Sequence, residues 1–208
     1  MIKSIVQKLY PFGVFRTGEA VYLTFDDGPI PEVTPKVLDI LAKYDVKATF
    51  FMVGENIDKH PEVFEQVVKA GHSIGNHTYN HLKGWNCDTD EYMTNVGKCN
   101  KALFEHYPGF FIPTLFRPPY GKATFRQRLA LHDEGYQIIY WDILTRDYKA
   151  EQTPEMMLTQ IKREVRKGSI INFHDSLKSN ERMLEVLPQA IEWLQAQGYV
   201  LERLEVRG

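Results

Sequence analysis

The sequence is poor in cysteine and in long apolar runs, and neither charge sign dominates. Two cysteines, Cys87 and Cys99, stand among 208 residues, which is too few for a disulfide framework and has no zinc-ribbon spacing. We therefore expect two reduced thiols, as in a cytosolic protein. No segment approaches the run of about 20 apolar residues that a transmembrane helix needs. The N-terminus also lacks the apolar stretch of about 7–15 residues of a secretory signal, so we expect a cytoplasmic protein, with export by another route left open.

The charge balance excludes one class of partner. The chain has 25 basic and 27 acidic residues and a formal net charge of −2. Since it also has no basic tract, we expect no nucleic-acid partner. The sequence does not define an oligomeric state.

The length is that of one domain with a single well-buried core. We predict one catalytic domain over residues 1–208. Residues 1–10 place their apolar side chains at helical spacing. We expect this amphipathic segment, within residues 1–19, to pack on the domain, and the alternative is a helix that rests on a membrane surface.

Strand-like apolar runs alternate with helical patterns along the whole chain. Strands are predicted at 21–25, 47–53, 72–75, 115–117, 136–142, 169–173 and 199–206. Helices are predicted at 34–44, 61–70, 88–106 and 123–134, from 153 towards Gly168, and at 181–197, where Pro188 kinks the helix or starts a second piece. This alternation predicts an α/β fold with a parallel sheet. Closure into a barrel would remove the sheet edges, and an open doubly wound sheet is the alternative.

Polar residues able to do chemistry gather where the predicted strands end. They are Asp26, Asp27, His77, His81, Arg117, Tyr120, Asp142, Asp147, His174 and Asp175. Because sites in parallel α/β folds lie at the carboxyl ends of the strands, we expect these side chains at one rim. For Asp142 a hydrogen bond inside the barrel is the alternative, and for Asp175 we favour a cap of the turn after His174 over a role in the reaction. Asp-Asp-Gly-Pro at 26–29 is also good turn chemistry, but the gathering at one rim favours a functional site.

Two histidines have the spacing of metal ligands. His77 and His81 are four residues apart, and in a first helical turn they would lie on one face. With a carboxylate from another strand end they form a set of three metal ligands. Three protein ligands leave one coordination position of the metal open for water, as in catalytic sites. One of the two aspartates, Asp26 and Asp27, then binds the metal while the other acts as general base. The cation offsets the repulsion between the two carboxylates.

Four motifs together resemble the NodB-type polysaccharide deacetylases, carbohydrate esterase family 4. They read Thr-Phe-Asp-Asp-Gly-Pro at 24–29, His-Thr-Tyr-Asn-His at 77–81, Arg-Pro-Pro-Tyr at 117–120 and Phe-His-Asp-Ser at 173–176. The resemblance covers nearly the whole chain. It implies an irregular seven-stranded (β/α) barrel of the NodB-homology type, in agreement with the seven predicted strands.

The resemblance also implies a role for each matched residue. Asp26 corresponds to the base, and Asp27, His77 and His81 correspond to the ligands of a divalent metal. The family usually holds Zn²⁺, and Co²⁺ or Ni²⁺ are the alternatives.

The remaining matched residues surround that centre. The backbone N–H of Tyr120 would join the metal in stabilising the tetrahedral oxyanion, and Arg117 would pair with acidic groups around the base. His174 would be the general acid that protonates the leaving group. Asp147 would orient its imidazole and raise its pKa, because a nearby anion favours the charged form.

Two departures from the family pattern concern the acyl pocket. Where the family often has Asp-x-x-Asp-Trp, this chain keeps Asp147 but has Leu144 and Tyr148 at the outer positions. Where it often has Leu-x-His, this chain has Asn172, although that leucine helps to hold the acetyl methyl group. The acyl pocket is therefore altered, or a side chain from a neighbouring strand fills it. We also count Tyr120, Trp85 and Tyr148 as substrate-binding residues, since aromatic faces suit sugar rings.

The sequence thus predicts a metal-dependent hydrolase that removes acetyl groups from a carbohydrate, with N-acetylglucosamine-containing oligo- or polysaccharide as the expected substrate. One alternative within enzymes is O-acetyl ester hydrolysis on a glycan such as xylan. Another is hydrolysis of a small non-sugar amide. The alternative from a different class is a metal-containing carbohydrate-binding protein without catalysis.

Overall fold

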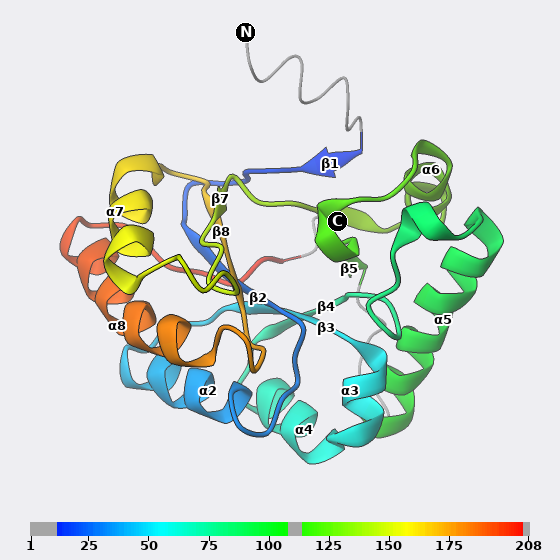
Figure 1. Cartoon of the computed structure of the whole chain (residues 1–208), viewed down its shortest axis with the longest axis horizontal. Coiled ribbons are helices and arrows are strands. Elements are labelled where there is room, and N and C mark those ends of the chain that lie inside the picture. Colours follow the sequence, from blue (N-terminus) through cyan, green and yellow to red (C-terminus); the bar gives the residue numbers. More distant parts are fainter. Residues whose placement is uncertain (1–11, 108–113, 206–208) are drawn as a thin grey trace, which may run out of the picture.

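One parallel sheet of eight strands forms the centre of the protein (Figure 1). The computed structural model describes residues 12–107 and 114–205, so the amphipathic segment predicted at residues 1–10 lies outside the described residues. The strands are β1 (Gly13–Val14), β2 (Tyr22–Asp26), β3 (Thr49–Met52), β4 (Ser73–Asn76), β5 (Leu115–Phe116), β6 (Gln137–Ile139), β7 (Ile143–Leu144) and β8 (Ile170–His174).

The sheet curls into a partial barrel. Its strand order is β1-β6-β5-β4-β3-β2-β8-β7, and every neighbouring pair is parallel. Within residues 12–107 and 114–205, β1 and β7 end the sheet without pairing with each other. The predicted α/β barrel type is therefore confirmed, with eight strands in place of seven.

Helices cover the outside of the curled sheet. Figure 1 shows α7, α8, α2, α4, α3, α5 and α6 in an arc around the strands. Their bounds are α2 (Thr34–Lys43), α3 (Gly54–Lys59), α4 (Pro61–Lys69), α5 (Thr89–His106), α6 (Phe125–Asp133), α7 (Pro154–Glu164) and α8 (Asn180–Ala196), with 3₁₀ turns η1 (Gly84–Asn86) and η2 (Pro119–Gly121). None of the helices described is long and apolar enough to cross a bilayer.

Local sequence signals set where the helices begin. The side chain of Asp88 accepts a hydrogen bond from Glu91 N at the start of α5, and Thr153 does the same for Met156 N at the start of α7. Thr124 and Gln127 form a reciprocal capping box at the start of α6. These side chains satisfy backbone N–H groups that a helix cannot pair internally.

The main apolar core lies between the sheet and the helices. Phe25 of β2 stacks on Phe50 of β3 and on Phe173 of β8, with ring centroids 5.0 and 5.7 Å apart. Because side chains alternate along a strand, the neighbours Thr24 and Asp26 point to the opposite, inner face of the sheet. Both are buried there. The curled sheet therefore supplies a buried polar interior beside its apolar outer core.

The strand predicted at 199–206 is wrong for the described residues. Up to residue 205 this segment makes only one isolated bridge, between Leu201 and Val21. The physical reason is that β2 has little free edge, because it pairs with β8 from Tyr22 onward and with β3 from Thr24 onward.

Three elements lie where the sequence predicts none. β1 and β7 have only two residues each, and α3 has six. The strand predicted at 136–142 is shorter, ending at Ile139, and the chain then crosses to pair as β7 with β8. Pro188 lies inside one helix, α8, so it does not start a second piece. β1, β7 and α3 are too short for their side chains to show a period of 2.0 or 3.6, which is why the sequence does not predict them.

Candidate active site

The predicted site residues meet at the carboxyl ends of the strands, except Asp142. Its carboxylate accepts hydrogen bonds from Ser169 Oγ and Ile170 N at the start of β8, so the prediction of Asp142 at this rim is wrong. Asp26 is the last residue of β2 and its register partner on β8 is His174. Asp27 follows β2, His77 follows β4, and Arg117 follows β5. Parallel pairing therefore brings together residues that are far apart in the sequence, as expected for this class of fold.

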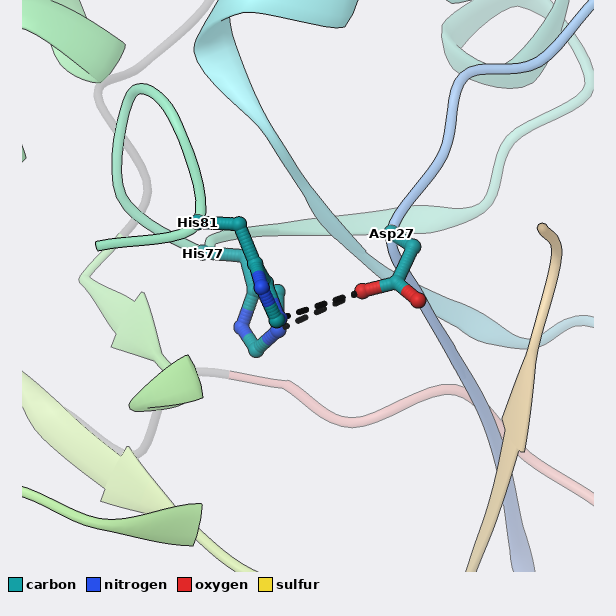
Figure 2. Close-up of side chains that lie close together, drawn as sticks. All are labelled: Asp27, His77 and His81. Atoms are coloured by element: carbon teal, nitrogen blue, oxygen red, sulfur yellow. Dashed lines mark ion pairs between the residues drawn. The ribbon is translucent and has the colours of Figure 1, made fainter. Parts of the chain in front are cut away.

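Asp27, His77 and His81 form a three-residue cluster (Figure 2). Asp27 Oδ1 lies 3.8 Å from His77 Nε2 and 3.4 Å from His81 Nε2. One ligand atom from each residue lies within 4.8 Å of the others. This is the ligand set that the sequence predicts, and the structure brings all three residues together.

The protonation of His77 shows that the cluster suits a cation. Nδ1 of His77 lies 2.6 Å from the backbone oxygen of Arg117, which can only accept, so Nδ1 carries the proton. Burial lowers the pKa of His77 to about 4, and burial also lowers the pKa of His81. The neutral His77 ring therefore presents an Nε2 lone pair towards Asp27 Oδ1, a buried oxygen without a hydrogen-bond partner among the described residues. Lone pairs that converge in this way need a positive centre between them, so the residues fit a divalent metal.

The backbone that carries the two histidines is not helical. Residues 77–83 contain no helix, so the predicted helical turn is wrong, although the predicted clustering of His77 and His81 is present. Thr78, His81 and Asp27 have positive φ values of 65°, 56° and 86°. Such conformations cost about 1–3 kcal/mol each for residues other than glycine and gather at functional sites.

Asp26 and Arg117 form a buried ion pair beside the cluster. Arg117 Nη1 donates to Asp26 Oδ1 over 2.7 Å, and both side chains are almost fully enclosed. Burial alone would raise the pKa of Asp26, but the charge and hydrogen bond of Arg117, together with the nearby His77 and His174, outweigh it and the pKa is lowered. Asp26 is therefore an ionised carboxylate next to the candidate metal ligands, as a general base must be.

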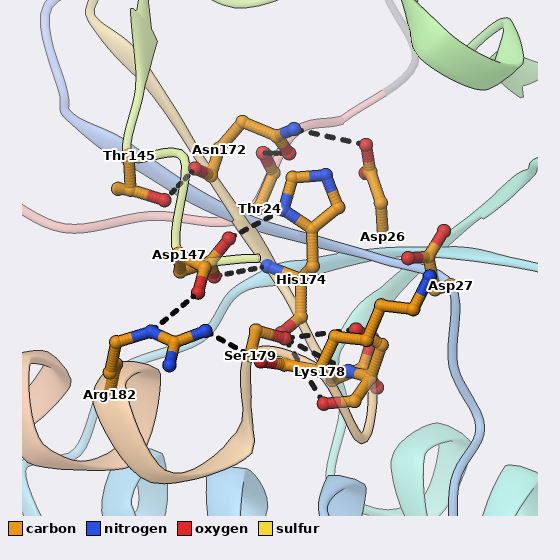
Figure 3. A network of polar contacts seen from close by, with 12 residues as sticks. Thr24, Asp26, Asp27, Thr145, Asp147, Asn172, His174, Lys178, Ser179 and Arg182 are labelled. Atoms are coloured by element: carbon orange, nitrogen blue, oxygen red, sulfur yellow. Dashed lines mark hydrogen bonds and ion pairs between the residues drawn. The ribbon is translucent and has the colours of Figure 1, made fainter. Parts of the chain in front are cut away.

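Asn172 lies within this ion pair and not at the surface. Its side chain is fully buried and contacts Asp26 (Figure 3). It also contacts Arg117. The sequence prediction placed Asn172 against the substrate's acyl group, whereas the structure gives both of its amide atoms protein partners. Its register partner on β7 is Leu144, the other departure from the family pattern.

His174 and Asp147 form a second pair near Asp26 (Figure 3). His174 Nδ1 lies 2.8 Å from Asp147 Oδ1, and the backbone N–H of His174 donates to Asp147 Oδ2 over 2.8 Å. Burial acts to lower the pKa of His174, but the charge of the fully buried Asp147 and its hydrogen bond raise it to about 9. His174 is therefore a protonated imidazole near neutral pH, which suits a general acid.

Asp147→Asn tests this pair through the pH dependence of turnover. If the protonated form of His174 is required, activity falls as pH rises through about 9. Without the Asp147 charge, burial lowers the His174 pKa, so we expect the alkaline limb of kcat/KM to move to lower pH by at least about one unit. A pH profile of kcat/KM from pH 6 to 10 measures this, and an unchanged limb would contradict the assignment.

Tyr120 lies at the tip of a strained turn beside His81. Its φ is 59°, and its ring centroid lies 4.6 Å from that of His81. The hydrogen bonds of the turn run from Gly121 N to Pro118 O and from Lys122 N to Pro119 O. No acceptor in the described part of the chain takes the Tyr120 N–H. This N–H is therefore available to bind an oxygen that develops negative charge.

Exposed aromatic rings flank the site on two sides. Trp85 packs edge-on against Tyr120 with ring centroids 5.4 Å apart, and 46% of Trp85 is exposed. Tyr148 packs edge-on against His174 with centroids 5.0 Å apart and is 40% exposed. Trp141 is half-buried and lies over the Arg117 guanidinium. Trp85, Tyr120 and Tyr148, the residues predicted to bind substrate, are thus exposed beside the site.

Asp175 has a role that the sequence did not indicate. It is buried, and its two oxygens accept hydrogen bonds from Gly28 N and Thr34 Oγ1, so it ties the end of β8 to the turn that follows Asp27. Burial raises its pKa to about 8. The interpretation as a cap of its own turn misses this contact, which depends on the β2–β8 pairing.

Comparison with known proteins gives a family match. The family model for polysaccharide deacetylase matches residues 15–139. A peptidoglycan-N-acetylglucosamine deacetylase of Bacillus cereus is 36% identical over 86% of this chain and 83% of its own length. A chitooligosaccharide deacetylase of Azorhizobium caulinodans is 34% identical over 91% of this chain and 90% of its own.

Solved structures agree with these matches. The crystal structure of the Bc1960 peptidoglycan N-acetylglucosamine deacetylase superposes with a TM-score of 0.89 at 30% identity, covering 95% of this chain and 94% of that one. A pseudoenzyme of carbohydrate esterase family 4 from Bacillus anthracis has a TM-score of 0.83 at 27% identity, covering 92% of this chain and 67% of that one. The fold therefore occurs in enzymes and in a pseudoenzyme alike.

Proposed function

The chain belongs to the polysaccharide deacetylase family, and from this premise we propose that it removes N-acetyl groups from N-acetylglucosamine units of an oligo- or polysaccharide with a divalent metal. The observation that carries the proposal is the convergence of an ionised base, Asp26, and a protonated acid, His174, on the Asp27, His77 and His81 cluster.

Asp27, His77 and His81 would hold the cation. Bound there, a divalent metal supplies Lewis-acid polarisation of the acetyl carbonyl and of the attacking water. Two imidazoles and one carboxylate suit Zn²⁺, and Co²⁺ or Ni²⁺ accept the same ligands.

The protein's own groups would carry the proton transfers. Asp26 accepts a proton from the attacking water, because Arg117 keeps its carboxylate ionised. The Tyr120 N–H donates to the carbonyl oxygen as that oxygen becomes negative. His174 then donates its proton to the departing nitrogen, and Asp147 stabilises the imidazolium before the transfer.

The names of the relatives support an amino-sugar substrate. The Bacillus cereus relative is named a peptidoglycan-N-acetylglucosamine deacetylase, and the Azorhizobium relative is named a chitooligosaccharide deacetylase. The exposed rings of Trp85 and Tyr148 stand on either side of the site, where the apolar faces of sugar rings can pack. Acetate release from chitooligosaccharides, peptidoglycan fragments and O-acetylated xylan tests the proposal. We expect release from the first two, whereas release from xylan alone would favour the O-acetyl esterase.

Trp85→Ala tests the sugar-binding surface. Loss of an aromatic contact of this kind costs about 0.5–1.5 kcal/mol, so we expect KM for chitotetraose to rise about two- to tenfold with little change in kcat. The matched control is Phe104→Ala, which truncates an exposed aromatic residue of α5 outside the site. An unchanged KM in Trp85→Ala would remove Trp85 from the substrate surface.

A further inference from the structure

We propose that Asn172 is a positioning residue for the general base, an inference that rests on the proposed function. The side-chain amide of Asn172 fixes the second oxygen of the Asp26 carboxylate while Arg117 fixes the first. The reaction would then depend on a residue that never touches the substrate.

The contacts of Asn172 carry the argument. Its Nδ2 donates to Asp26 Oδ2 over 3.1 Å, and its Oδ1 accepts from Arg117 Nη1 over 2.6 Å and from Thr24 Oγ1 over 3.2 Å. All four side chains are buried. The amide therefore bridges the anion and the cation of the buried Asp26–Arg117 ion pair.

The register of the sheet places Asn172 there. It pairs with Thr24 on β2, two positions before the Asp26–His174 pair. Side chains two positions apart on a strand share a face, so Asn172 lies on the same inner face as His174, and Thr24 lies on the same inner face as Asp26. The neighbouring position on β7 is the apolar Leu144. Of the two paired positions on β7 and β8, Asn172 therefore supplies the polar side chain beside the ion pair.

The chemistry of the neighbours fixes the orientation of the amide. Arg117 can only donate hydrogen bonds, so the Asn172 oxygen must face it. The ionised Asp26 can only accept, so the Asn172 nitrogen must face it. The amide provides both halves at this position, whereas leucine provides neither, and aspartate provides the acceptor but places a second negative charge against Asp26.

Both oxygens of Asp26 are consequently held. Arg117 Nη1 lies 2.7 Å from Oδ1 while Asn172 holds Oδ2. With both ends fixed, the carboxylate cannot rotate about its terminal bond, and each oxygen keeps a lone pair for the proton of the attacking water. Pre-orientation of a reacting group is worth large factors in rate, so the loss of this hold will appear in kcat.

Asn172→Asp and Asn172→Leu test the inference. A hydrogen bond to a charged group is worth about 1.5–3 kcal/mol, so we expect kcat on chitotetraose to fall about 10- to 100-fold in each variant. We expect KM to change less than twofold and bound zinc per chain to stay at the wild-type value. Asn172→Asp keeps the shape and the acceptor of the native side chain but replaces the donor by a second carboxylate oxygen facing Asp26, so it removes the hold on Asp26 Oδ2 even if Asn172→Leu does not fold.

Thr49→Val is the matched control for structural damage. Thr49 is buried on β3, and its hydroxyl accepts a hydrogen bond from Leu204 N. We expect this variant to have a lower melting temperature than the wild type but the same kcat. The inference is overturned if the Asn172 variants keep kcat within twofold, if KM rises in place of a fall in kcat, or if kcat falls only in proportion to the folded fraction. Failure of the proposed function is distinct from these outcomes, because wild-type protein with bound zinc would then release no acetate.

Discussion

Asp26→Asn will reduce kcat for deacetylation by about 10²–10⁴-fold while the protein keeps its metal. This range is the typical contribution of a general base. The amide cannot take the proton of the attacking water, whereas Asp27, His77 and His81 remain in place to bind zinc.

Acetate release and zinc content measured on the same preparation check this result. In this variant Arg117 loses the one ion-pair partner it has within residues 12–107 and 114–205, so the melting temperature is measured alongside. A folded, zinc-containing Asp26→Asn protein with activity within tenfold of wild type would show that another group is the base.

His81→Ala will weaken zinc binding and abolish turnover at limiting zinc. Loss of a partner that only orients a ligand costs about 10–100-fold in metal affinity, and loss of a ligand costs more. Titration of metal-free protein with Zn²⁺, followed by calorimetry, measures the affinity.

His132→Gln provides the matched control. This histidine of α6 is exposed, with more than half of its side-chain surface accessible, and pairs with its neighbour Asp133. It should bind zinc and turn over substrate as the wild type does. Wild-type zinc affinity in His81→Ala would exclude His81 as a ligand.

The sequence was sufficient to locate most of the candidate site. Because a parallel sheet aligns the carboxyl ends of its strands, the positions of Asp26, His77, Arg117 and His174 in the chain predict their convergence. The patterns of 3.6 and 2.0 residues likewise predict the long helices and the buried strands. These features depend on local sequence, so they can be inferred without coordinates.

Features that depend on neighbouring segments could not be predicted. Asn172 owes its role to three partners on β2 and after β5, and Asp175 owes its role to the turn at Gly28. His77 and His81 converge through left-handed backbone positions, although their spacing suggests a helix. The segment 199–206 has a strand-like pattern, but β2 has little free edge to receive it, and up to residue 205 the segment makes one isolated bridge. In each case tertiary contacts decide between conformations that the local sequence permits equally.

The polar interior explains how the fold maintains this site. Buried charges are costly unless they are paired and hydrogen-bonded. Here Arg117 donates to Asp26, Thr24, Asn172 and two backbone carbonyl groups, so its buried charge is well compensated. The same contacts that satisfy Arg117 hold the carboxylate of the base, and stability and positioning therefore depend on one network.

The most direct test of the account is to count the acetate and the free amino groups formed from chitotetraose by wild-type protein, metal-free and after addition of Zn²⁺. We predict that zinc-loaded protein releases acetate and exposes an equal amount of amine, and that metal-free protein does neither. Equal turnover with and without metal would contradict the role assigned to Asp27, His77 and His81. Zinc binding without any acetate or amine would place this chain with the pseudoenzyme of the family.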